Sequence, residues 1–126
     1  MSQEYIAGSC NIGNGEVRRR QVVALAGAVI SVTSLVGLIN SDATRSARLT
    51  LFFPLMVFAI GFIQSRKKFC LAYGFMGTFN FGKLGQISRV SDPAAKKADR
   101  KTALTILAQS VFLALGLTLT AYLLPL

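Results

Sequence analysis

The chain has 126 residues, 52% of them hydrophobic, and a formal net charge of +9 at pH 7. A soluble domain of this size needs more polar surface to cover its core, so the composition excludes an ordinary soluble protein. The length leaves room for one domain. We predict a single membrane domain over residues 1–126 with an all-α integral membrane fold.

Three uncharged runs follow one another along the chain, at residues 22–39, 49–63 and 102–126. A helix needs about 20 apolar residues to cross a hydrocarbon core about 30 Å thick. The first and third runs are long enough, and the second is long enough if it tilts or if its flanking arginines reach the interface. The sequence therefore predicts three transmembrane helices, at about 21–40, 43–64 and 102–124.

Capping residues mark where the first two helices are expected to begin. Asn14 can cap the first helix, and Glu16 in its first turn suits the positive helix end. Asp42 is the corresponding cap for the second helix. Pro54 falls inside that second helix and should kink it.

The third helix has the clearest start signal. Asp92 followed by Pro93 combines a capping side chain with a proline at the first helical position. From there the chain can continue as one helix to Leu123, so the basic residues between 96 and 101 form a cytoplasmic extension of the third span.

The first span is expected to be an uncleaved helix. Arginines at positions 18–20 precede it, as basic residues precede the apolar core of a secretory signal. However, the run 22–39 is long for such a core, and no A-x-A-like cleavage site follows it.

Basic residues predict the orientation of the chain. If the three arginines at 18–20 are cytoplasmic, 12 of the 14 Lys and Arg residues lie inside, and only Arg45 and Arg48 lie outside. This bias places the N-terminus in the cytoplasm and the C-terminus outside. The basic residues on the cytoplasmic side are then expected to contact anionic lipid headgroups. The basic residues cluster beside predicted spans and no binding module is recognisable, so we predict no binding to nucleic acid.

An aromatic segment, FCLAYGFMGTFNFG at residues 69–82, lies between the second and third spans. As a helix its 14 residues would extend about 21 Å, which is too short to cross the membrane. A fourth span would also move most basic residues outside. We therefore predict that residues 69–90 form a cytoplasmic segment that is interfacial, re-entrant or packed under the helices.

The chemistry that this chain lacks excludes several functions. It contains no histidine, the commonest metal ligand and the usual axial ligand of haem. The three uncharged runs offer no ionisable group for proton-coupled transport. Paired carboxylates, a nucleophile elbow and a phosphate-binding loop are absent from the sequence. We therefore predict no enzyme activity, no cofactor and no metal.

Two cysteines, Cys10 and Cys70, are both predicted on the cytoplasmic side, just outside a helix. A reducing compartment should keep them as free thiols, and neighbouring basic residues can raise thiol reactivity. Three roles remain open: packing at an interface, redox or sulfur chemistry, and capture of a soft monovalent metal ion.

A short pattern covers residues 10–80. Asn11-Ile12-Gly13 precedes the arginines of the first helix, and after the second helix come Cys70-Leu71-Ala72-Tyr73 and Gly77. This pattern resembles the small YgaP-like transmembrane domain of bacterial inner-membrane proteins, which typically reads N-[IV]-G and C-P-x-Y-x-x-x-G.

The resemblance implies a bacterial inner membrane, helix-mediated dimerisation and, where a rhodanese domain is fused, the handling of sulfur compounds. This chain has Leu71 in place of the usual proline, lacks a rhodanese domain and adds a third helix. The residues that match the pattern are Asn11, Gly13, Cys70, Tyr73 and Gly77.

Small residues suggest helix packing. The first helix has a stripe at helical spacing, and the third has a looser one together with Gln109, which needs a hydrogen-bond partner in lipid. The stripe on the first helix consists of Ala24, Gly27, Ala28, Ser31 and Ser34. The leading prediction is a non-catalytic accessory or scaffold subunit of a membrane complex, or a homo-oligomer. The alternatives are a channel or facilitator for a sulfur anion or soft metal ion, and a thiol-based sensor.

Overall fold

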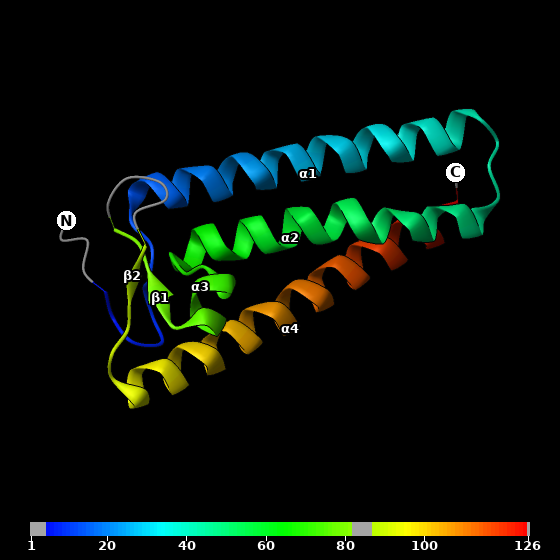
Figure 1. The fold of residues 1–126 in the computed structure, drawn as a ribbon. Helices are drawn as coiled ribbons and strands as arrows, with labels where there is room; N and C mark the ends of the chain where they lie inside the picture. Colours follow the sequence, from blue (N-terminus) through cyan, green and yellow to red (C-terminus); the bar gives the residue numbers. More distant parts are fainter. Residues whose placement is uncertain (1–4, 82–86, 126) are drawn as a thin grey trace.

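Three long helices dominate the computed structural model, which describes residues 5–81 and 87–125 (Figure 1). Helix α1 is Asn14–Asn40, the 3₁₀ helix η1 (Arg45–Leu51) leads directly into α2 (Phe52–Lys67), and α4 is Pro93–Leu123. The stretches Asn14–Asn40, Arg45–Lys67 and Pro93–Leu123 are each long and apolar enough to cross a membrane. The prediction of three such helices is confirmed.

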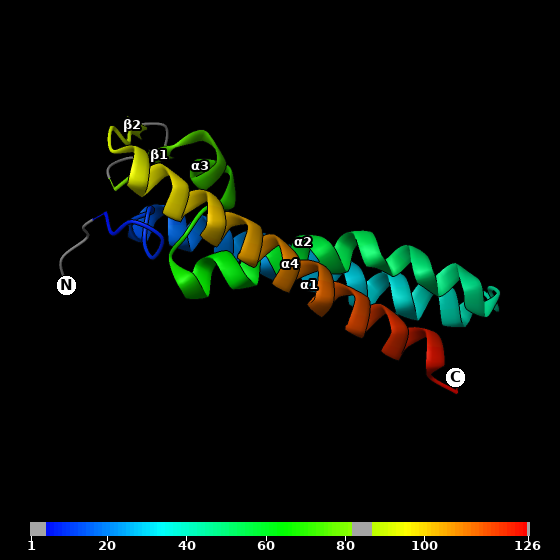
Figure 2. The same cartoon turned by 90° about the horizontal axis from the view of Figure 1, so that it is seen from below.

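Helix α2 lies between α1 and α4 and packs against both (Figures 1 and 2). Most of the apolar surface of the three helices points outward. Examples are Val22, Leu25, Phe53 and Phe112, whose exposed fractions are 61%, 66%, 72% and 76%. So much outward apolar surface is unfavourable in water, and it suits a lipid environment.

Two predicted caps are wrong. Gly13 is the N-cap of α1, and Asn14 is already its first helical residue. Asp42 lies in a turn with a φ of +54° and donates its backbone N–H to Ile39, while Thr44 precedes η1. The backbone N–H of Asp42 thus satisfies a free carbonyl at the end of α1, and the next helix begins only at Arg45, with Thr44 at its N-cap position.

Two further predictions concern proline, one at the start of α4 and one inside the second span. Asp92 caps α4 as predicted, because its side chain accepts the backbone N–H of Ala94 at 3.1 Å. Pro54 lies in the first turn of α2, just after the change from 3₁₀ to α geometry. Since proline has no N–H to donate, this change of helix type falls where the hydrogen-bond ladder is already interrupted.

The described residues are mostly helical, as predicted, but the segment between the second and third spans also forms two short strands. This segment contains a short helix α3 (Leu71–Met76) and two short strands, β1 (Thr78–Phe79) and β2 (Ser88–Arg89). The strands pair antiparallel with Thr78 opposite Arg89. Gly77, with a φ of +70°, ends α3 and turns the chain into β1, a conformation that favours glycine. Residues 82–86 of the predicted segment lie outside the described residues.

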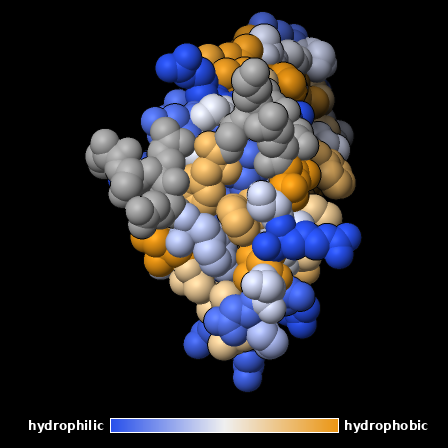
Figure 3. All heavy atoms as spheres, turned by 60° about the vertical axis from the view of Figure 1, so that its left-hand side comes forward, coloured by the Kyte–Doolittle hydropathy of each residue, from blue (hydrophilic) through white to orange (hydrophobic). Residues whose placement is uncertain are grey.

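Residues 5–13, 69–81 and 87–92, which we call the head, gather at one end of the three helices (Figure 1). Phe69 is fully buried against Ala103 and Ile106 of α4, and α3 packs on the same helix. The described part of the segment thus packs against α4, and its place relative to the membrane stays a prediction. Figure 3 brings this end forward and shows hydrophilic side chains interspersed with apolar ones.

At the other end of the helices, Arg45 and Arg48 belong to η1, within the range predicted for the second span. Arg48 is buried, and its Nη1 donates to the carbonyls of Ala121 and Leu124 at 3.0 Å each. Arg45 donates to Leu124 at 3.3 Å. The last carbonyls of α4 have no intrahelical partner, so these guanidinium groups satisfy them.

Candidate functional site

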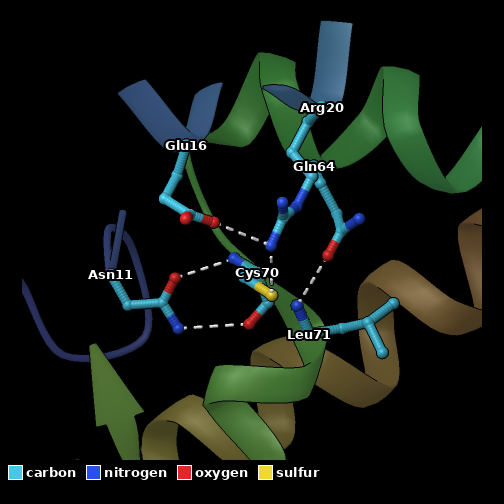
Figure 4. Close-up of polar contacts among 6 residues, drawn as sticks. All are labelled: Asn11, Glu16, Arg20, Gln64, Cys70 and Leu71. Atoms are coloured by element: carbon cyan, nitrogen blue, oxygen red, sulfur yellow. Dashed lines mark hydrogen bonds and ion pairs between the residues drawn. The ribbon is translucent and has the colours of Figure 1, made fainter. Parts of the chain in front are cut away.

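Asn11 and Cys70 form a paired contact at the centre of the head, although 59 residues separate them. The backbone N–H of Cys70 donates to Asn11 Oδ1 at 2.7 Å, and Asn11 Nδ2 donates to the Cys70 carbonyl at 3.2 Å (Figure 4). Asn11 is fully buried. One amide side chain therefore fixes the residue that caps α3, and the two halves of the sequence pattern meet in space.

Gly13 and Asn80 extend this contact through the backbone. Asn80 N–H donates to the Asn11 carbonyl, and Gly13 N–H donates to the Asn80 carbonyl, both at 2.9 Å. Gly13 has an extended backbone, which does not require glycine. The sequence reasoning did not identify Asn80, which is 1% exposed, because no local pattern around it signals its pairing with residues 11–13.

The thiol of Cys70 accepts a hydrogen bond from Arg20 Nη2 at 3.1 Å (Figure 4). The same nitrogen lies 3.0 Å from a carboxylate oxygen of Glu16, which is 2% exposed. The basic residue that contacts the Cys70 thiol is therefore Arg20 of α1, 50 residues away in the sequence. The guanidinium is shared between the thiol and a buried carboxylate, so much of its positive charge is compensated within the cluster.

Gln64 holds the start of α3 on the other side of Cys70. Its Oε1 accepts the backbone N–H of Leu71 at 2.9 Å, and the side chain is 6% exposed. Proline, which the YgaP-like pattern has at this position, could not donate this hydrogen bond. The departure at Leu71 therefore has a structural use in this chain. Sequence reasoning missed Gln64, although an amide in the last turns of an apolar helix is a visible signal.

Tyr73 and Gly77 are structural parts of the head. Tyr73 packs with Ile12 and Cys70 in a small buried cluster. Burial, and then the negative charge of Glu16, raise the pKa of Tyr73 above its ordinary value, because both disfavour the phenolate. The Gly77 carbonyl accepts the N–H of Val90 at 2.8 Å, which ties the end of α3 to the chain before α4.

Cys10 lies apart from this cluster, in a tight turn that pairs it with Ile6. It is half-buried, and its Sγ is 3.7 Å from the Ile12 carbonyl. Both cysteines are free thiols. Within residues 5–81 and 87–125, no group of three or more Cys, Asp or Glu residues is placed to hold a metal ion.

Asp99 is a buried anchor that sequence reasoning missed. Its carboxylate is fully buried in α4 and accepts hydrogen bonds from the Tyr5 hydroxyl and from the Gly8 N–H, the latter at 2.6 Å. Thr102 of the same helix donates to the Gly8 carbonyl at 2.6 Å. Burial, the hydrogen bond to Asp99 and nearby negative charge raise the pKa of Tyr5, which keeps its hydroxyl a donor. In the sequence, Asp99 stands out as the single acidic residue between positions 96 and 101, and this was the signal that could have identified it.

Gln109 is separate from the head. It lies in α4 on the exposed side, and no hydrogen bond links its side chain to another described residue. The candidate residues thus divide into a group that holds the head together and one amide on the outer surface of a spanning helix.

Comparisons with known proteins give no relative: no family model, curated protein or solved structure matches the chain. The likeness of residues 10–80 to the YgaP-like domain therefore stays a prediction.

Proposed function

We propose that this chain is a non-catalytic accessory or scaffold subunit that assembles, with itself or with other subunits, in the bacterial inner membrane. The buried polar side chains in and beside the head support this reading, because they bond to the backbone of the head and hold the fold. Asn11 binds the backbone of Cys70, Gln64 binds that of Leu71, and Asp99 binds the N-terminal segment. Side chains occupied in this way are poorly placed to carry out chemistry.

Gln109 is the observation that carries the proposal. It follows Lys101 by eight residues, which places it about 12 Å along α4 past the last charge, inside the hydrocarbon region of the predicted span. A primary amide facing lipid is unfavourable unless it finds a partner. Around it, an outward stripe combines bulky residues with a glycine that leaves open space: Thr105, Phe112, Gly116, Leu119 and Leu123. A second helix that packs on this stripe would satisfy the amide.

We expect Gln109→Leu to weaken assembly about threefold, since hydrogen bonds between membrane helices average about 0.6 kcal/mol. The measurement is energy transfer between labelled copies in vesicles, with quantitative mass spectrometry of proteins that co-purify from native membranes. Gln21→Leu is the matched control, because Gln21 is exposed at the start of the apolar run of α1. Unchanged assembly would place the interface elsewhere, and complete loss would make Gln109 a functional ligand.

The second candidate function is a thiol-based sensor, which the contact between Arg20 and Cys70 favours. If Cys70 only packs, we expect Cys70→Ser to insert and assemble normally and to lose about 1 kcal/mol or less of stability. Its buried thiol should then react with maleimide more slowly than the half-buried Cys10, each measured with the other cysteine changed to Ala. Faster labelling of Cys70, or a null phenotype in well-inserted Cys70→Ser, would favour the sensor.

We also propose that the N-terminus and the head face the cytoplasm and that the C-terminus lies outside. The distribution of the 14 basic residues supports this orientation. In a chain without native cysteines, we expect Ser91→Cys to react with a membrane-impermeant thiol reagent only after the membrane is permeabilised. Ser46→Cys, in η1 at the opposite end, should react from outside. Both positions are exposed, so the reverse labelling pattern would invert the topology.

A further inference from the structure

A groove beside Cys70 has no role in the proposed function. It lies between the start of α1, the last turns of α2 and the start of α3, and its volume is about 350 Å³. Its polar side chains include Arg19, Arg20 and Gln64, and apolar walls are formed by Val23, Ile60 and Leu71. The groove therefore has a polar edge and an apolar wall, as expected of a site for an amphiphile.

The polar edge offers hydrogen-bond donors. Gln64 Oε1 is already occupied by the Leu71 N–H, so the Gln64 amide nitrogen is the group left for a ligand. Within the described residues this nitrogen has no acceptor, and Figure 4 shows it directed away from Leu71. Gln64 is 6% exposed and lines the groove, so its position is fixed and its unused amide donor is available to a phosphate oxygen in the groove.

Positive charge at the same edge supports an anionic ligand. Arg19 is exposed and forms no ion pair with a described residue. Arg20 is partly neutralised by Glu16, whose carboxylate contacts the guanidinium that also donates to Cys70. Arg19 thus supplies the uncompensated charge, and a guanidinium matches a phosphate group in geometry as well as in charge.

The position of the groove identifies the source of the phosphate. Arg19 and Arg20 lie just before the uncharged run that begins at Val22, and Gln64 lies two residues before Arg66 at the charged end of α2. The groove therefore lies at the border between the apolar spans and their basic ends. A free anion would gain nothing from the walls formed by Val23 and Ile60, whereas the acyl chain of a lipid would cover them.

We propose that this groove binds an anionic phospholipid of the adjoining leaflet. The lipid phosphate lies at Arg19 and the Gln64 amide, and the first methylene groups of an acyl chain lie along Val23 and Ile60. This site is more specific than the general attraction of basic residues to the membrane surface, because it combines an unused amide donor and an exposed guanidinium with an apolar wall. It does not depend on assembly through Gln109.

Native mass spectrometry of the full chain in detergent tests the site, with titration of phosphatidylglycerol, phosphatidylcholine or inorganic phosphate. We expect tight binding of one phosphatidylglycerol molecule and weak binding of phosphatidylcholine. Arg19→Gln should bind phosphatidylglycerol about tenfold more weakly than Arg18→Gln, the size of effect expected for one hydrogen bond to a charged group. Arg18 is exposed and does not line the groove, so this control removes the same charge nearby.

A second variant tests the groove without changing its charge. Ala72 is exposed and lines the groove, so Ala72→Trp should block the lipid while the fold is kept. Gln109→Leu should bind lipid as the unmodified chain does, which separates this site from the assembly surface. The proposal would be overturned if Arg19→Gln and Arg18→Gln bound phosphatidylglycerol with equal affinity. It would also be overturned if phosphatidylcholine were retained as well as phosphatidylglycerol, or if millimolar inorganic phosphate displaced the lipid.

Discussion

Gly27→Ala is expected to separate α1 from α2 and to lower the free energy of unfolding by about 3 kcal/mol, the upper end of the usual cost of overpacking. A Cβ at this position would lie 2.6 Å from the backbone nitrogen of Phe58. Gly61→Ala should act in the same way, since its Cβ would lie 2.8 Å from the Arg20 carbonyl oxygen. In both cases the obstacle is backbone, so no side-chain rotation can relieve the clash.

Another glycine of the same helix provides a matched control for this test. A Cβ at Gly37 in α1 would meet nothing within 4 Å. Alanine favours a helix over glycine by up to about 1 kcal/mol in peptides, so Gly37→Ala should leave stability unchanged or slightly raised. The measurement is loss of helix content during SDS titration in mixed micelles. Equal stability of Gly27→Ala and Gly37→Ala would show that the helices do not meet at Gly27.

Asn11→Ala should loosen the head and cost about 2 kcal/mol, because it leaves the buried N–H of Cys70 without an acceptor. The Cys70 carbonyl keeps a second partner, the N–H of Gly74 at 3.0 Å, so the loss is concentrated on one group. Amide hydrogen exchange over residues 69–76 should accelerate about 30-fold, which corresponds to this energy when opening is local.

The matching control is Asn40→Ala, which removes the same side chain from the exposed end of α1. Exchange in the head should be unchanged in this variant, and the central turns of α2 and α4 should stay protected in both. If Asn11→Ala exchanges like the unmodified chain, the paired contact between Asn11 and Cys70 does not hold α3 in place.

Packing between α1 and α2 shows how far a sequence pattern can be taken. The small-residue stripe on the first helix correctly indicated a close contact, since Ala24, Gly27 and Ser31 are buried. The pattern could not say whether the partner was another helix of the same chain or a second molecule. The backbone of Phe58 against Gly27 assigns this contact to α2 within the chain.

The sequence by itself determined the three long helices and the start of α4. Uncharged runs predict the helices because a segment that crosses lipid must form its backbone hydrogen bonds within itself, and that requirement is local. The Asp92–Pro93 cap is also a matter of neighbouring residues, which explains why α4 was predicted from Pro93 to Leu123 as it is observed.

Only the tertiary structure decided how the head is built and which polar side chains stay exposed. Asn11 reaches Cys70 across 59 residues, and Gly8 reaches Asp99 across 91. Contacts at such separations leave no periodic signal in one sequence, since they depend on how the helix ends are brought together. The same is true of Gln109: its residue type was visible in the sequence, but its exposure depends on which face of α4 packs against α2.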